Sequence, residues 1–318
     1  MMIAIAGGSG FFGVNTARCL AERGQEVLLI QRHQIDPPPL LTPFWGKEVK
    51  QAIGNILDLS FLIGLVKTYA IDSIIHAAHM THGMKPDPRT RKSGEALHQL
   101  LEVQIVGIMN CLEAARLMNL RRVTFTSSVD LYRGLPHQCE DWHEDAFLPP
   151  LSFSEIGNSK RAMEQICFLY KDYYGLSVAS LRIGANYGPA CGSMGINEMI
   201  HNAVEGKRTE IPMLASNRRT HPVYAKDTAE AACLVHLAES LKHYIYNVAD
   251  GSHPTMQEIA GVIKEVIPKA DIQLGPSGEE VEIRRQNMDR IRDELGFVPR
   301  TLKEGVTAYV TFLREGQY

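Results

Sequence analysis

A glycine-rich turn at the start of the chain constrains its fold more than any other feature. The apolar run Ile3–Ala6 leads directly into this turn, and helical periodicity begins at Phe11. In a strand–turn–helix unit, successive glycines permit the tight turn, let backbone amides approach a pyrophosphate, and let the helix pack against the strand. The helix N-terminus adds amide donors and a positive dipole end. We therefore predict a dinucleotide site formed by Gly7, Ser9, Gly10, Phe11, Phe12 and Gly13.

Apolar runs and helical patterns alternate along the first part of the chain. Strands are predicted at Ile3–Ala6, Val27–Ile30, Val49–Ile53, Asp72–His76, Arg122–Thr126 and Val178–Arg182. Helices are predicted between them at Phe11–Arg23, Leu59–Tyr69, Glu95–Met118 and Gly157–Tyr174. Parallel strands need crossovers of this kind. The pattern predicts an α/β fold with a doubly wound parallel sheet of the Rossmann type.

The second half of the chain has more glycine and proline between its predicted elements. It contains a strand at Ile245–Val248 and helices at Ile196–Glu205, Asp227–Ser240, Thr255–Ile267 and Leu302–Leu313. We expect a dinucleotide-binding domain of residues 1–183 plus 221–249. Residues 184–220 plus 250–318 are expected to form a smaller, interleaved substrate-binding region.

Composition narrows the partners of the protein. A net charge of −3 provides no basic excess for nucleic acid. No apolar run reaches the length of a membrane span, and the N-terminus lacks the pattern of a signal peptide. The six cysteines form no CxxC pair, which favours reduced thiols over a disulfide framework or a zinc site. A cytoplasmic protein with a small-molecule substrate, and without a nucleic-acid or membrane partner, is expected.

The end of the second predicted strand bears on the choice of cofactor. An acidic residue there binds the ribose 2′-hydroxyl of NAD, whereas a basic one accommodates the 2′-phosphate of NADP. This chain has Gln31-Arg32-His33. Arg32 therefore favours NADP over NAD, and the alternative is a solvated loop arginine.

Motifs spread over nearly the whole chain resemble those of the extended short-chain dehydrogenase/reductases, in the NAD(P)-dependent epimerase/dehydratase group. Gly7–Gly13 resembles the family's GxxGxxG, and Phe125–Tyr132 resembles its SSSxxVYG segment. Ser159-Lys160 with Glu164 is similar to SKxxxE. Gly54–Asp58 resembles the family's adenine-side GDxxD, with Asn55 in place of Asp, and His76-Ala77-Ala78 resembles the HxAA segment that lies along the cofactor. Leu181–Pro189 resembles LRxxNVYGP, and later family motifs are matched at Tyr246–Val248 and Leu295–Pro299.

The resemblance implies a specific chemistry and a homodimer. In this family a tyrosine exchanges a proton with a substrate hydroxyl, a lysine four residues later holds the ribose, and a serine bonds the substrate oxygen. Ser128 and Lys160 match the serine and the lysine, and the resemblance implies that Lys160 also binds the cofactor. Asn55, Ile56, His76, Ala77 and Ala78 complete the implied cofactor contacts. The dimer is implied to form through the helices Glu95–Met118 and Gly157–Tyr174.

Two positions depart from the family pattern. The tyrosine position is occupied by Ile156, which can neither give nor take a proton. The asparagine of the long helix is replaced by Gln104. Glu155 lies about 100° round the helix from Ile156, so it is not an automatic substitute.

The main candidates to replace the tyrosine are Tyr132, Asp130 and His79, all near strand ends where open α/β sheets bind ligands. Tyr187, which follows the next strand, is another. Tyr132 also matches a position that packs around the cofactor, and Asp130 is also suited to capping a turn. His82 is a further candidate. The spacing of His76, His79 and His82 suggests a metal, but no carboxylate completes the set, so no metal is predicted.

Tyr187, Arg219 and Arg285 are predicted to contact the substrate. Arginine suits bidentate recognition of phosphate or carboxylate. Arg284-Arg285 lies where the family places phosphate contacts, and Arg218-Arg219 lies about one residue from the family's phosphate-binding arginine. The alternative is that both are solvated charge pairs. The sequence thus predicts an NAD(P)-dependent oxidoreductase or epimerase that acts on a polar carbonyl or hydroxyl compound, such as a nucleotide sugar, with a non-standard proton donor. The alternatives are a catalytically silent dinucleotide-binding or regulatory protein, and a redox-neutral lyase or isomerase.

Overall fold

The first strand shows how the sequence builds the core. In the computed structural model, which describes residues 1–79, 94–135, 141–152, 154–192, 195–278 and 283–315, β1 (Met2–Ala6) is entirely buried. Side chains alternate across a strand. Ile3 and Ile5 therefore enter one hydrophobic cluster, while Ala4 and Ala6 enter another on the opposite face of the sheet. A strand buried on both faces is typical of a parallel sheet covered by helices.

Seven strands of the described residues form one parallel sheet in the order β11-β7-β5-β4-β1-β2-β3. They are β1, β2 (Glu26–Gln31), β3 (Val49–Ile53), β4 (Ile71–His76), β5 (Arg122–Ser128), β7 (Val178–Ile183) and β11 (Ile245–Val248). The chain first adds strands to one side of β1 and then returns to add β4 and the rest on the other side. The topological switch point, where such sheets bind ligands, therefore lies between β1 and β4.

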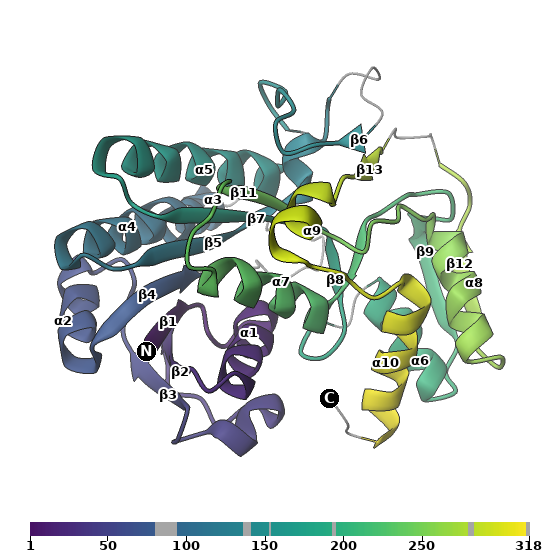
Figure 1. Ribbon diagram of the computed structural model, residues 1–318. Coiled ribbons are helices and arrows are strands. Elements are labelled where there is room, and N and C mark those ends of the chain that lie inside the picture. Colours follow the sequence, from purple (N-terminus) through teal and green to yellow (C-terminus); the bar gives the residue numbers. More distant parts are fainter. Residues whose placement is uncertain (80–93, 136–140, 153, 193–194, 279–282, 316–318) are drawn as a thin grey trace.

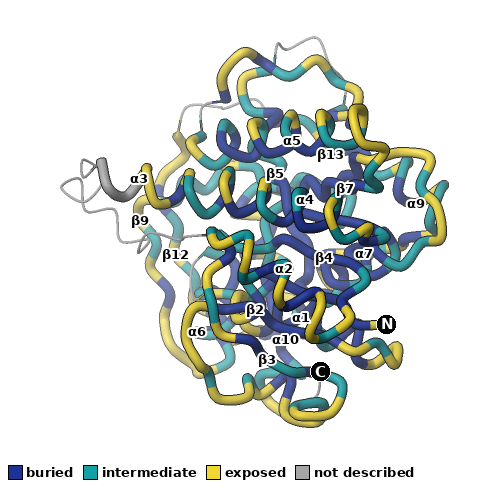
Figure 2. The backbone as a smooth tube through the Cα atoms, turned by 90° about the vertical axis from the view of Figure 1, so that its left-hand side faces the viewer, coloured by how far each residue is buried: buried dark blue, intermediate teal, exposed yellow. Residues whose placement is uncertain are grey.

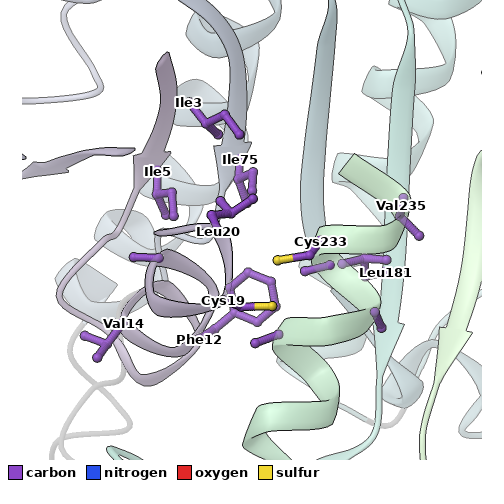
Figure 3. Close-up of a cluster of buried hydrophobic side chains, with 14 of the residues drawn as sticks. Ile3, Ile5, Phe12, Val14, Cys19, Leu20, Ile75, Leu181, Cys233 and Val235 are labelled. Atoms are coloured by element: carbon purple, nitrogen blue, oxygen red, sulfur yellow. The ribbon is translucent and has the colours of Figure 1, made fainter. Parts of the chain in front are cut away.

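Helices cover both faces of this sheet (Figure 1). One face carries α1 (Phe11–Glu22) and α7 (Ala225–Leu237), and the other carries α2 (Leu59–Tyr69), α4 (Gly107–Met118) and α5 (Glu155–Tyr174). Figure 3 shows the first of these layers: Phe12 and Leu20 of α1 lie between Ile5 of the sheet and α7. The predicted doubly wound α/β fold is confirmed.

The predicted helix Glu95–Met118 is divided by a π-helical turn. The helix begins as α3 (Gly94–Leu101), widens into η3 (Glu102–Val106), and continues as α4. Gly107, the first residue of α4, lies close to the end of β4: a Cβ on it would be 3.2 Å from His76 Nε2 and 2.7 Å from Ile56 Cδ1. The π-turn therefore lies directly beside the carboxyl edge of the sheet.

The C-terminal part has a hydrophobic cluster of its own, seen at the right of Figure 1. Its helices are α6 (Ile196–Val204), α8 (Met256–Val266) and α10 (Leu302–Glu315). Short parallel strand pairs accompany them: β8 (Ala185–Tyr187) with β10 (Pro222–Tyr224), and β9 (Thr209–Ala215) with β12 (Ile272–Gly275). Ile291, on α9 (Asp289–Leu295), instead belongs to the cluster that contains α1 and α7.

Every strand and helix predicted from the sequence is present, with ends that differ by a few residues. The sequence did not predict the short strands just named, the pair β6 (Asp141–Trp142) and β13 (Arg285–Gln286), helix α9, or the 3-10 helices η1 (Pro39–Phe44) and η4 (Val129–Tyr132). Among the described residues, no helix combines the length and apolar character needed to span a bilayer.

Candidate active site

The glycine turn after β1 forms a cradle that side chains would fill. Gly7 has φ +84°, and a Cβ on it would lie 2.6 Å from the backbone of Ala78. A Cβ on Gly13 would lie 2.6 Å from the Gly7 carbonyl oxygen. Gly10 caps the N-terminus of α1, where the Val14 N–H donates to its carbonyl. The bare backbone and helix N-terminus fit a dinucleotide pyrophosphate.

The adenosine end of this site is shaped by two loops. Gln51 of β3 receives a hydrogen bond from the backbone N–H of Ile35 and donates one to its carbonyl, which fixes the loop that carries exposed Arg32. Asn55 is exposed, and its side chain accepts a bond from the Leu57 N–H. Asp58 caps α2 through the Phe61 N–H. Arg32 and Asn55 thus lie at the carboxyl ends of β2 and β3, on the same edge as the cradle.

Lys160 lies on the other side of the cradle, in the interior. Its Nζ is 3.3 Å from Thr126 Oγ1 of β5, and the residue is 4% exposed. Burial lowers the pKa of the Lys160 ammonium to about 8. His76, at the end of β4, is fully buried. Burial, assisted by the charge of Lys160, lowers the pKa of His76 to about 3, so its ring is neutral at physiological pH.

Ile156 occupies the first turn of α5, one turn before Lys160. Ser154 caps this helix by accepting a hydrogen bond from the Gly157 N–H. A Cβ on Gly157 would lie 2.7 Å from the Asp130 carbonyl oxygen, so this end of α5 packs closely on the loop after β5. Ile156 is half-buried and Glu155 is exposed. The structure therefore places an aliphatic side chain where the sequence pattern calls for a proton donor.

Ser128 and Asp130 both belong to the loop after β5. Ser128 Oγ accepts a hydrogen bond from the Asp130 N–H and so caps η4. The Asp130 carboxylate is engaged at both oxygens: Arg133 Nε is 2.7 Å from Oδ1, and Ser154 Oγ donates to Oδ2 at 2.9 Å. Asp130 is thus paired with a cation and ties the loop to the start of α5, an arrangement that disfavours its predicted role in proton exchange.

The structure argues against Tyr132 as a proton donor to a substrate. Tyr132 is 0% exposed, receives a hydrogen bond from Arg182 Nη1 and donates one to Asn247 Oδ1, both at 2.8 Å. Burial raises the pKa of its hydroxyl. Arg182 in turn forms a bidentate, buried ion pair with Glu164. Tyr132 is therefore one member of an interior network and is enclosed by the described residues around it.

Tyr187 does not line the site either. It is 1% exposed and packs in the C-terminal cluster, where its hydroxyl donates to the Leu302 carbonyl at 3.4 Å. A Cβ on Gly305 would lie 2.0 Å from that hydroxyl, so α10 closes directly over the ring. α10 thus covers Tyr187 in this structure, which disfavours the predicted contact with a substrate.

The remaining candidate, His79, follows β4 by three residues. Its Nδ1 contacts Nε2 of Gln104, which is fully buried in the π-turn η3. His82 lies outside the described residues. Within the part of the chain that the structure describes, no three His, Cys, Asp or Glu side chains gather as metal ligands.

The predicted substrate arginines face other partners. Arg219 donates to the His253 carbonyl at 3.0 Å and lies 3.8 Å from Glu258 of α8. Arg285 of β13 pairs with Asp141 of β6 at 2.5 Å. Both residues thus brace local structure, and their contact with a substrate stays a prediction.

Comparison with known proteins agrees with this geometry. The family model described as NAD dependent epimerase/dehydratase family matches residues 3–249. The chain belongs to the NAD dependent epimerase/dehydratase family.

Relatives of this epimerase/dehydratase chain extend over its full length. It is 27% identical to dTDP-4-dehydro-6-deoxy-D-allose reductase of a Streptomyces species, with 96% of this chain and 93% of that protein covered. It resembles the crystal structure of UDP-glucose 4-epimerase from Thermotoga maritima with UDP-glucose, with a TM-score of 0.83, 19% identity and 99% of both chains covered. The UDP-glucose 4-epimerase of Thermus thermophilus in complex with NAD gives a TM-score of 0.78 and 24% identity over the whole of both chains.

Two further arginines of this epimerase/dehydratase chain, Arg133 and Arg218, lie near the loop after β5. The sequence indicated Arg218 only as the neighbour of Arg219, and it did not indicate Arg133. Arg133 follows the Leu131-Tyr132 pair at the position of the glycine in SSSxxVYG, a departure that could have been noticed. Arg133 pairs with Asp130. Burial lowers the pKa of the Arg218 guanidinium, and the nearby charge of Arg133 lowers it further. Arg218 therefore lies within electrostatic reach of Arg133 and Asp130 in the loop after β5.

Proposed function

We propose that this chain is an NAD(P)-dependent oxidoreductase or epimerase that acts on a nucleotide sugar. The observation that carries the proposal is the pairing of the Gly7–Gly13 cradle with buried Lys160 at one edge of the sheet, in a member of the epimerase/dehydratase family. Relatives of similar length are named as reductases and epimerases of dTDP- and UDP-sugars. A nucleotide sugar is therefore the substrate class that we infer.

Different residues of the chain are proposed to bind the cofactor and the substrate in this reaction. When bound, the nicotinamide supplies an acceptor or donor for a hydride at a carbinol carbon. The cradle amides would hold the pyrophosphate, and Lys160 would hold the nicotinamide ribose. Ser128 is proposed to bond the reacting substrate oxygen. Arg133 and Arg218, on and against the loop after β5, provide positive charge for the anionic part of the substrate.

We further propose NADP as the preferred cofactor, because Arg32 stands at the end of β2 and no acid accompanies it. A cytoplasmic location is also proposed. The five cysteines within the described residues are free thiols, and this supports a reducing compartment.

A homodimer is proposed through α4 and α5, which lie side by side in Figures 1 and 2. Apolar side chains on this surface are unusually exposed: Met109 41%, Leu117 49%, Leu169 55%, Tyr173 79% and Tyr174 57%. An apolar patch of this kind marks an interaction surface. Analytical ultracentrifugation of Leu169→Lys/Tyr173→Lys should show monomers where the parent sediments as a dimer; a monomeric parent would contradict the proposal.

The direct test is hydride exchange. Purified protein is incubated with NADP⁺ or NAD⁺ and a panel of UDP- and dTDP-hexoses, and with NADPH or NADH and their 4-keto forms, while absorbance at 340 nm and sugar products are followed. Turnover of at least one nucleotide sugar is expected, faster with the NADP couple. Cofactor binding without turnover across the panel would remove the proposal.

A second candidate, a catalytically silent dinucleotide-binding protein, is favoured by one observation: Ile156 fills the position one turn before Lys160. Ile156→Tyr distinguishes the two. If the chain is silent, this variant gains hydride exchange on a nucleotide sugar that the parent binds but does not convert. If the chain is active, the parent already converts the nucleotide sugar, so Ile156→Tyr adds no new hydride exchange.

A further inference from the structure

His79 lies at the point of the sheet where ligands are bound. It follows Ala78, whose backbone forms the wall of the cradle opposite Gly7. The Ala77 N–H donates to the carbonyl of Ala6 at 2.8 Å, so the chain after β4 runs directly alongside the end of β1. His79 is thus one residue beyond the cradle wall, at the switch point between β1 and β4.

The fold positions the side-chain amide of Gln104 against His79. The residue is 0% exposed and lies within the π-turn η3, and its Nε2 contacts His79 Nδ1. Single π-turns inside α-helices occur frequently at functional sites, because they redirect a side chain. The family pattern has the shorter asparagine here. The extra methylene and the π-turn bring the amide of this chain to His79.

The amide oxygen of Gln104 indicates which tautomer of His79 this contact favours. Among the described residues, its Oε1 has no hydrogen-bond partner although it is buried. A half-turn of the amide places Oε1 on Nδ1, where it accepts the Nδ1–H proton. The ring then carries its basic lone pair on Nε2, and Oε1 also stabilises the imidazolium once Nε2 is protonated.

The alternatives to His79 are disfavoured by their surroundings. Tyr132 and Tyr187 are enclosed, both carboxylate oxygens of Asp130 are engaged, and His76 is fully buried next to Lys160. Histidine is also the side chain whose ordinary titration range suits acid–base work near neutral pH.

We propose that His79 performs the proton exchange for which the family uses a tyrosine, with Gln104 as its positioning residue; this rests on the proposed function. During oxidation, the substrate O–H bond breaks and its proton passes to His79 Nε2. The C=O bond would form as the carbinol C–H bond of the same carbon breaks, and a bound oxidised nicotinamide would supply the acceptor for that hydride. During reduction the imidazolium returns the proton to the oxygen as the hydride arrives.

The first test needs no activity. Imidazole ¹⁵N NMR of the parent should show neutral His79 mainly as the Nδ1–H tautomer. Gln104→Met keeps the length but removes the amide, and should return the ring to the Nε2–H tautomer that we expect for exposed His243. A His79 tautomer that matches His243 in the parent, and does not respond to Gln104→Met, would overturn the role of Gln104.

The second test uses turnover of a nucleotide sugar by the parent. His79→Gln should lower kcat about 100-fold or more, while NADPH affinity and the thermal midpoint stay near those of the parent and of the control His243→Gln. Adding Ile156→Tyr to His79→Gln should restore turnover, with an optimum moved to higher pH. Unchanged kcat and pH dependence in His79→Gln would overturn the catalytic role.

The two proposals fail in distinguishable ways. If the parent exchanges hydride but His79→Gln does so equally well, only the inference about His79 falls. If the parent binds NADPH and converts no sugar of the panel, the proposed function falls and the catalytic role of His79 falls with it, while the tautomer measurement still decides whether Gln104 orients the ring. Should His79→Gln unfold, Gln104→Met carries the kinetic test, with an expected shift in the pH profile.

Discussion

The two halves of the candidate site differ in what holds them together. The cofactor half consists of backbone: a glycine cradle, a helix N-terminus and the wall formed by Ala77 and Ala78. The half proposed for proton transfer consists of side chains from separate elements, such as Gln104 of η3 with His79 after β4. A site made of backbone tolerates little change at its glycines, whereas a site made of side chains can lose one group and gain another. Ile156 and Gln104, the two departures from the family pattern, both belong to the half made of side chains.

The largest effect is expected where the backbone half has no spare space. Gly7→Ala places a Cβ 2.6 Å from the Ala78 backbone, at φ +84° where side chains are disfavoured. We expect NADPH affinity to fall by about 100-fold or more, since roughly 3 kcal/mol of strain and displacement corresponds to that factor. Fluorescence titration of NADPH measures it.

Gly64→Ala is the matched control for this change. Gly64 lies in α2, and a Cβ there meets no atom within 4 Å. Its affinity for NADPH should equal that of the parent, and its helix should gain slightly in stability. Parent-like affinity in Gly7→Ala would show that the cradle does not hold the dinucleotide.

Lys160 connects the two halves, and its burial opposes folding. Its ordinary pKa of 10.5 falls to about 8 in the folded protein. Below pH 8 the side chain is charged in both states and its burial opposes folding by about 3 kcal/mol. Between pH 8 and 10.5 the folded protein is the first to release the proton, so its stability rises with pH, and above 10.5 the penalty is gone.

Lys160→Met should therefore unfold at higher urea concentration than the parent at pH 7, by up to about 3 kcal/mol, with a smaller difference at about pH 9.5. The same variant should bind NADPH more weakly, as expected when a functional group is retained at the expense of stability. Lys171→Met, on the exposed surface of α5, is the control and should change neither property. A gain in stability that did not shrink with pH would contradict the buried charge.

Tyr132→Phe sharpens the comparison by separating stability from chemistry. The change removes the hydroxyl that bonds Arg182 and Asn247, so we expect a loss of about 1–3 kcal/mol in unfolding free energy. The pH profile of turnover should stay that of the parent, because the hydroxyl is enclosed. Tyr173→Phe, on the exposed surface, should change neither. A lost or displaced pH profile in Tyr132→Phe would make this tyrosine a candidate proton donor again.

The same contrast explains what could be predicted from sequence. The cradle, Ser128, Lys160 and the strands of the large sheet are encoded by short, local patterns. The pairs β6–β13 and β8–β10 form only when residues far apart in the chain meet, and two-residue or three-residue strands carry no periodicity of their own. The enclosure of Tyr132 and Tyr187 could not be predicted for the same reason, since their hydrogen-bond partners Asn247 and Leu302 are each 115 residues away. The π-turn that aims Gln104 has no recognisable sequence signal in this chain.

Arg32 is the side-chain exception within the backbone half, and the smallest effect is expected there. It is exposed at the end of β2, so its attraction to a 2′-phosphate is weakened by water and salt. Arg32→Ala should raise the Kd for NADPH about 10-fold and leave that for NADH unchanged, with the difference shrinking as salt is added. Arg208→Ala, which removes an exposed arginine paired with Glu210 of β9, should alter neither Kd. If NADH binds the parent more tightly than NADPH, or if Arg32→Ala weakens both equally, Arg32 is a solvated loop residue and the cofactor is chosen by the backbone half alone.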